Sequence, residues 1–203
     1  MLSQEIWNQG QELEQFVAEM QSNQARMRTR INNIRLTPFE RSLFRNLDRK
    51  IFMFVLTEDW CGDSLMNVPI LAQLAHLSPN LDLRIFPRHR FPDIRAYYGE
   101  RGYEHIPLVL FADEEWNEIG IWMERSKFAA LRLKAWNAAQ PEMTEITNNQ
   151  NLSSEEKRNL LEPYLDQLKE EMEDWYDQGL QSSTVDEISV LLGLRSFTIL
   201  LYC

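Results

Sequence analysis

The chain has 203 residues, a formal net charge of −10 and 44% hydrophobic residues. This apolar content is sufficient for a packed core and excludes an intrinsically disordered chain. The acidic balance argues against a nucleic-acid-binding protein, because such proteins need a basic surface for the phosphate backbone. The acidity is uneven, since residues 141–203 carry a net charge of −9 and residues 1–140 only −1. We interpret this excess as the solvated face of a helical segment.

The chain shows no targeting or metal-binding pattern. Its start has no basic segment followed by an apolar one, and no stretch approaches the roughly 18 consecutive apolar residues of a membrane span. We therefore expect a cytoplasmic protein with no membrane partner. The two cysteines, Cys61 and Cys203, are too few for a disulfide framework. Neither has a nearby cysteine or histidine at metal-ligand spacing, so we expect no metal site.

The first part of the chain is predicted to be helical. Apolar residues recur at helical spacing over residues 13–34, which predicts one amphipathic helix. Thr37, Pro38 and Glu40 then form a helix start signal, in which Thr37 and Glu40 make a capping box and Pro38 fits the first helical position.

The middle of the chain alternates strands and helices. Residues 51–56 are an unbroken apolar run, which is typical of a strand buried on both faces of a sheet. A helix that contains Pro69 and a second strand follow, and these three elements form a βαβ unit. After this unit we expect a short helix, a β-hairpin and a further helix. The predicted order is strand 51–56, helix 65–75, strand 81–85, helix 93–98, strands 107–112 and 117–122, and helix 126–139.

The last part of the chain is polar and acidic. We interpret residues 147–151, TNNQN, as a linker. Ser153 and Glu156 form another capping box and open a long acidic helix with one apolar seam, which we expect to fold back on the body. The remaining predictions here are a helix over 184–192 and a final segment, 197–203, that could be a strand or a buried helix.

Four features of the middle segment resemble the thioredoxin fold. They are Trp60-Cys61-Gly62 after a buried strand, Pro69 inside the next helix, Ile106-Pro107 before the third strand and Gly120 in the fourth. The segments EDWCGD, LRIFPR and IPLVLF resemble, more narrowly, a family of bacterial thioredoxin-like proteins with helical flanks. The resemblance implies an α/β fold with a central mixed four-stranded sheet. It divides the chain into an N-terminal helical extension, 1–47, a thioredoxin-like core, 48–140, and an acidic C-terminal helical extension packed on the core, 141–203.

The chemistry of this site centres on one thiol. A cysteine at a helix N-terminus faces unpaired N–H groups and the positive end of the helix dipole, which favour its thiolate. Ser64 can donate a hydrogen bond to the Cys61 sulfur, whereas the Asp63 carboxylate opposes the thiolate, so the net direction of the pKa shift stays open. Gly62 allows a tight turn and the approach of a partner backbone, and Trp60 offers an apolar wall.

The resemblance also assigns roles to these residues. Cys61 and Ser64 are then the catalytic residues, and Trp60, Gly62, Asp63, Ile106 and Pro107 bind the substrate. Pro107 resembles the cis-proline of this superfamily, whose neighbouring backbone pairs with an extended substrate. The implied activity is thiol–disulfide exchange, with no bound cofactor.

Two departures from the family pattern point to a monothiol mechanism. Ser64 stands where dithiol thioredoxins have their second cysteine, and Val55 stands where they have a buried acid. A mixed disulfide on Cys61 must therefore be resolved by an external thiol. The candidates are a low-molecular-weight thiol as co-substrate, a reductase or other second protein and, as the least favoured, Cys203.

The implied partners are a disulfide-containing or thiolated protein and a low-molecular-weight thiol or a reductase. Arg88, His89 and Arg90 follow the second strand at the same sheet edge as Cys61 and could bind an anionic thiol such as glutathione or bacillithiol, although we favour a solvated loop. The alternative function is a redox-inactive thioredoxin-fold interaction module. In that case the acidic helical tail and the groove beside Trp60 would bind a partner protein.

Overall fold

The computed structural model describes residues 2–195 and contains a four-stranded sheet in the order β2-β1-β3-β4. Strand β1 runs parallel to β2, whereas β1 and β3, and β3 and β4, are antiparallel. The predicted mixed sheet is therefore present. The strands are β1 (Ile51–Thr57), β2 (Leu81–Pro87), β3 (Leu108–Ala112) and β4 (Glu118–Met123).

The side chains of β1 alternate between two apolar layers. Met53 and Val55 belong to a large core that includes the buried face of α5 (Gly62–Leu77). Phe54 and Leu56 belong to a second core on the opposite face of the sheet. Because both faces are covered, a strand with no polar residue before its end is stable here.

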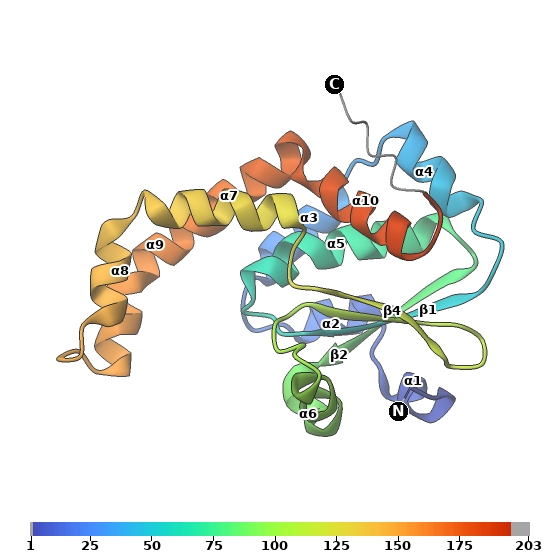
Figure 1. Ribbon diagram of the computed structural model, residues 1–203, viewed down its shortest axis with the longest axis horizontal. Helices are drawn as coiled ribbons and strands as arrows, with labels where there is room; N and C mark the ends of the chain where they lie inside the picture. The colour runs from blue at the N-terminus through green and yellow to red at the C-terminus, as the bar shows by residue number, and fades with distance from the viewer. Residues whose placement is uncertain (1, 196–203) are drawn as a thin grey trace.

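Helices cover both faces of the sheet (Figure 1). On the upper face in this view, α5 is packed between the sheet and a layer of helices from both ends of the chain. On the lower face, Trp7 and Tyr98 cover the aromatic side chains of the sheet. The upper helices next to α5 are α3 (Gln24–Asn33), α4 (Pro38–Arg45) and α10 (Gln181–Leu191), and the lower ones are α1 (Gln4–Gln9) and α6 (Pro92–Glu100).

The prediction of one helix over residues 13–34 is wrong. The structure has α2 (Leu13–Glu19) and α3, separated by a turn in which Asn23 has a left-handed φ of 57°. In this turn the backbone N–H groups of Gln21 and Ser22 donate to the Asp59 carboxylate at 2.7 and 3.0 Å. This distant carboxylate replaces the helical acceptors of these groups, so the break depends on a tertiary contact that the apolar spacing does not reveal.

The C-terminal part forms a projecting arm (Figure 1). It contains α7 (Lys127–Ala138), α8 (Pro141–Asn148) and α9 (Ser154–Trp175). The sequence did not predict α8, whose last residues are the first of the expected linker. The capping box of Ser153 and Glu156 begins α9 as expected.

Only the end of α9 reaches the body of the protein. Met172 and Trp175 are buried, whereas Leu160 and Leu165 are 47% and 43% exposed. The expected return of this helix to the core is therefore limited to its last turns. A short segment, η2 (Tyr176–Leu180), then leads into α10 through a kink at Gly179, whose φ is 132°.

Helix α10 packs on β4 at a position without a side chain. A Cβ atom on Gly120 would lie 2.7 Å from a side-chain carbon of Leu191, so a larger residue would require the Leu191 side chain to shift. The buried residues of α10 share one core with those of α3, α5 and β1. The ambiguous segment 197–203, and Cys203 with it, lies outside the described residues.

Candidate thiol site

Cys61 is the N-cap residue of α5 and faces the segment before β3. Its carbonyl accepts the Leu65 N–H at 3.0 Å, which is the first hydrogen bond of the helix. Its Sγ lies 3.4 Å from the carbonyl oxygen of Ile106, to which the thiol donates. The Ile106–Pro107 peptide bond is cis, and Pro107 is buried. The fold thus brings Cys61, Ile106 and Pro107 together from two distant parts of the sequence.

The thiol is largely enclosed, with Cys61 only 8% exposed. Burial raises the pKa of the Cys61 thiol, hydrogen bonding from Ser64 opposes this, and the negative charge of Asp63 adds to the increase. The net direction is upward. The sequence places Cys61 at a helix N-terminus, which favours the thiolate. It does not show how far the sulfur is buried away from solvent.

Ser64 lies beneath the thiol in the first turn of α5. The residue is 1% exposed, and its hydroxyl makes no full hydrogen bond within residues 2–195. It nevertheless lies near enough to the sulfur to lower the pKa of Cys61 in part, and so does the Ser64 backbone N–H. A buried hydroxyl without another acceptor is suited to stabilise a thiolate when one forms.

The Asp63 carboxylate is held by an arginine that directly follows β4. Arg125 donates from Nε to Oδ1 at 2.7 Å and from Nη2 to the second oxygen. Arg125 also pairs with Glu124 at 2.8 Å. Asp63 was expected to bind substrate, but its carboxylate is occupied within the fold. Its charge acts on Cys61 through space.

A buried polar cluster lies one turn further along α5. The Asn67 amide donates to the Asp63 carbonyl at 2.9 Å and to the Tyr176 hydroxyl at 3.1 Å, and its oxygen accepts from the Thr184 hydroxyl at 2.9 Å. Burial raises the pKa of Tyr176. The sequence analysis did not identify this cluster, although one asparagine in the apolar run LMNVPIL was a signal of it.

The segment before Cys61 is fixed by both neighbouring loops. The Asp59 carbonyl accepts from the Asn23 side chain at 2.9 Å. The Glu58 carboxylate accepts from the His89 backbone N–H at 2.7 Å and from its ring at 2.9 Å. His89 lies in the short 3-10 helix η1 (Arg88–Arg90). The basic loop is therefore partly neutralised by acids, since Arg90 also pairs with Glu19 at 3.2 Å.

A cavity of about 450 Å³ opens next to the thiol. One side of the cavity is the predicted site, where Trp60 is 59% exposed. A Cβ atom added to Gly62 would have no neighbouring atom within 4 Å, so the space beside it is open. Gly62 has no positive φ, so the tight turn expected of it is not required. The opposite wall comes from the arm. Its apolar residues are Leu133 of α7 and Leu165, Leu168 and Met172 of α9. The ionisable residues that line the cavity include Arg88, Glu104, His105, Glu124 and Lys169.

Residues 2–195 contain neither a metal-binding cluster nor a membrane-spanning helix. No group of three or more histidine, cysteine, aspartate or glutamate side chains is placed to hold a metal ion. No helix of this part of the chain is both long and apolar enough to cross a membrane.

Comparison with known proteins identifies the family. A family model described as thioredoxin matches residues 10–137. A Pseudomonas aeruginosa protein of unknown function is 20% identical, with a TM-score of 0.63 over 95% of this chain and 98% of that chain. An HIV epitope scaffold is 19% identical, with a TM-score of 0.61 over 97% of this chain and 100% of the other. These likenesses show the fold alone, and no curated protein matches. The chain belongs to the thioredoxin family.

Proposed function

We propose that the protein exchanges thiols and disulfides through Cys61 as a monothiol member of its family. The observation that carries the proposal is the position of the Cys61 sulfur. It lies at a helix N-terminus, 3.4 Å from the carbonyl that precedes a cis-proline, at the wall of a cavity large enough for a substrate. Pockets of about 300–1,000 Å³ are typical of small-ligand sites.

The reaction has two exchange steps. The Cys61 thiolate attacks one sulfur of a substrate disulfide, a new S–S bond forms, and the other substrate sulfur leaves as a thiolate that takes up a proton. An external thiolate then attacks the substrate sulfur of this mixed disulfide. Cys61 leaves as a thiolate, which the Ser64 hydroxyl stabilises, and it regains its proton on returning to the Ile106 carbonyl. These two steps leave the substrate sulfur in a disulfide with the external thiol. A second equivalent of that thiol attacks the external sulfur of this disulfide, forms the external disulfide and releases the substrate as a thiol, so two equivalents supply the two electrons.

The raised pKa of Cys61 determines the direction in which this site works best. A thiol with a higher pKa is a poorer leaving group, so the mixed disulfide on Cys61 persists until a resolving thiol arrives. Stabilised thiolates make strong oxidants, and a destabilised thiolate has the opposite effect. We therefore assign the protein a reducing or thiol-carrying role.

The cavity favours an extended substrate with an apolar group. The Ile106 N–H makes no backbone hydrogen bond within the described part of the chain and is available to an extended peptide. The Trp60 ring and the arm residues Leu165 and Leu168 offer apolar surface on either side of the sulfur. A disulfide-containing peptide with an apolar side chain near its cysteine fits both features.

The test is the formation of a mixed disulfide on Cys61. In a Cys203→Ser background, which removes the second thiol, the folded protein is mixed with oxidised glutathione and its intact mass is followed with time. We expect one glutathione to be added and then removed by a second thiol, and Cys61→Ser to show no addition. The rate for Cys61 in the folded protein is compared with the rate for the same thiol in the urea-unfolded chain, at equal thiolate fraction. If the folded protein reacts no faster, the site does not promote exchange. That result would favour the redox-inactive interaction module.

A further inference from the structure

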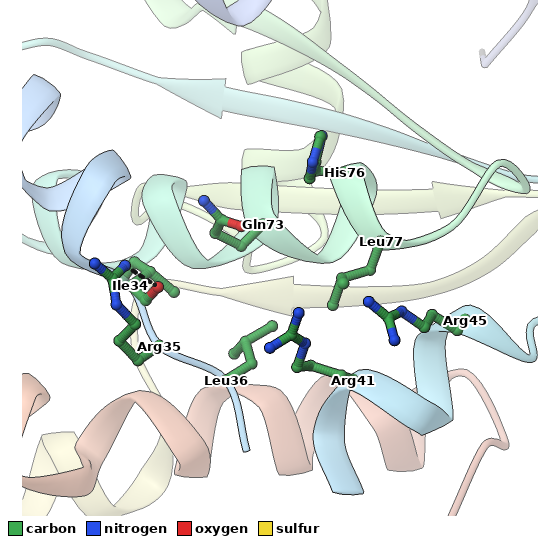
Figure 2. A pocket seen from close by; sticks show the side chains of 8 residues that line it. All are labelled: Ile34, Arg35, Leu36, Arg41, Arg45, Gln73, His76 and Leu77. Carbon is green, nitrogen blue, oxygen red and sulfur yellow. Dashed lines mark hydrogen bonds between the residues drawn. The ribbon is translucent and has the colours of Figure 1, made fainter. Parts of the chain in front are cut away.

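A second cavity lies at the far end of the helix that carries Cys61. Its volume is about 390 Å³, and it is enclosed by the end of α3, by α4 and by the last turns of α5. Cys61 begins α5 and Leu77 ends it, so the two sites are separated by a helix of 16 residues, or about 24 Å at 1.5 Å per residue. Figure 2 shows the side chains around this second cavity.

The ionisable residues of this cavity are three arginines and a histidine. Arg35, Arg41, Arg45 and His76 line it, together with neutral side chains, and no carboxylate is among the lining residues. Within residues 2–195 none of these three arginines forms an ion pair, whereas Arg101, for example, donates to both carboxylate oxygens of Glu118. A concentration of unpaired arginines is unexpected in a chain with a net charge of −10.

Helix α4 presents two of these arginines on a firmly anchored support. The capping box of Thr37 and Glu40 fixes its start, and Phe44 is fully buried beneath it. Arg41 and Arg45 are four residues apart, so they lie on one face, and their guanidinium groups point to the same side of the cavity (Figure 2). Like charges at this spacing repel one another. An anion bound between them would remove that repulsion.

The rest of the cavity is lined by three apolar side chains and by Arg35, Gln73 and His76, and it is partly pre-ordered. Ile34 is buried, and Leu36 and Leu77 are half-buried beside it. Arg35 donates from Nη1 to the backbone carbonyls of Asn32 and Ile34 at 2.6 and 3.0 Å, which fixes its guanidinium near the rim. An occupant would therefore meet cationic donors on one side and apolar carbons on the other.

We propose that this cavity binds a small organic phosphate. Its phosphate group would accept hydrogen bonds from Arg41 and Arg45, because the planar guanidinium fork matches phosphate oxygens in a bidentate geometry. Its organic part would cover Leu36 and Leu77. A volume of about 390 Å³ is in the range of small-molecule sites, whereas a membrane or an extended phosphopeptide would need a broader surface.

Calorimetric titration with phenyl phosphate tests the proposal, because this probe joins a phosphate to an apolar ring. Inorganic phosphate and phenol, titrated separately, distinguish the two halves of the ligand, and each should bind more weakly than phenyl phosphate. The variant Arg41→Gln/Arg45→Gln should lose about tenfold or more in affinity, since hydrogen bonds to charged groups are the strong ones. Arg95→Gln is the matched control, because Arg95 is an exposed arginine on α6 away from the cavity.

A second variant keeps the test decisive if the double glutamine variant is misfolded. Arg41→Lys/Arg45→Lys retains both charges without the fork and should bind phenyl phosphate with an intermediate affinity. The proposal is overturned if phenyl phosphate does not bind the unchanged protein, or if its affinity survives in a folded glutamine variant. It is also overturned if Arg95→Gln causes the same loss. Equal affinity for inorganic phosphate would reject an organic ligand.

Discussion

The side-chain nitrogen of Asn67 lies 3.1 Å from the hydroxyl of Tyr176, and both residues are fully buried. This hydrogen bond joins α5, whose N-cap is Cys61, to the kinked segment η2 at the end of the arm. Asn67 also holds the carbonyl of Asp63 at 2.9 Å, in the turn that positions the thiol. The arm and the first turn of α5 are therefore connected through one amide group.

Replacing this amide should destabilise the protein. In Asn67→Ala the hydroxyls of Tyr176 and Thr184 lose a buried partner, and we expect the free energy of unfolding to fall by about 1–3 kcal/mol. Urea denaturation measures this change. Asn8→Ala is the control, because Asn8 is exposed and its loss should change stability by less than about 0.5 kcal/mol. Equal effects of the two substitutions would show that the buried cluster contributes nothing particular.

The pKa of Cys61 can be measured by alkylation. Its reaction with iodoacetamide in the Cys203→Ser background should keep accelerating above about pH 8.5, the ordinary thiol value, because the raised pKa delays formation of the thiolate. The Cys61 thiol holds its proton more tightly in the folded state than in the unfolded chain. Its contribution to the free energy of unfolding should therefore decline as pH rises from the ordinary thiol pKa through the raised one. A profile with its midpoint below 8.5 would contradict the dominant effect of burial.

The charge of Asp63 contributes to this raised pKa. Asp63→Asn removes a negative charge near the sulfur and leaves Arg125 paired with Glu124 alone, and both changes favour the thiolate. The alkylation profile should therefore move to lower pH. Asp93→Asn is the matched control, because Asp93 lies in the first turn of α6 and is exposed. An unchanged profile in Asp63→Asn would show that the aspartate has no influence on the thiol.

The contact between Gly120 and Leu191 controls the packing of α10. Gly120→Ala should destabilise the protein by about 1–3 kcal/mol through overpacking. Adding Leu191→Ala to this variant should cost less than Leu191→Ala costs in the unchanged protein, because the smaller side chain makes room for the new methyl group. In α6, Gly99→Ala meets no atom within 4 Å and should stabilise by about 0.5–1 kcal/mol. Simple additivity of the Gly120 and Leu191 substitutions would argue against the contact.

The arm should influence which substrates react with Cys61. Leu165→Ser removes apolar surface from the cavity wall, and we expect exchange with an apolar peptide disulfide to slow by about three- to tenfold. Exchange with oxidised glutathione should change little. Leu160→Ser is the control, because Leu160 is similarly exposed on the same helix but does not line the cavity. Equal rates of exchange with the apolar peptide disulfide in the two variants would show that the arm does not influence substrate selection.

Local signals were sufficient for much of the fold. The apolar run at residues 51–56, the alternating strand after it and the two capping boxes at Thr37 and Ser153 each fix an element through contacts within a few residues. The position of the thiol at the start of α5 also follows from its neighbours in the sequence. These features depend on backbone geometry and on nearby side chains, which is why the sequence alone reveals them.

The tertiary structure decided what surrounds that thiol. The sequence determined that one cysteine would stand at a helix N-terminus after a buried strand. Its enclosure by Ile106, the Arg125 side chain on Asp63 and the arm wall at Leu165 come from residues 45 to more than 100 positions away. The direction of the Cys61 pKa depends on how much water these segments exclude. The desolvation of a group depends on all the atoms that surround it in the folded protein. A local pattern of residues does not show how many such atoms there are.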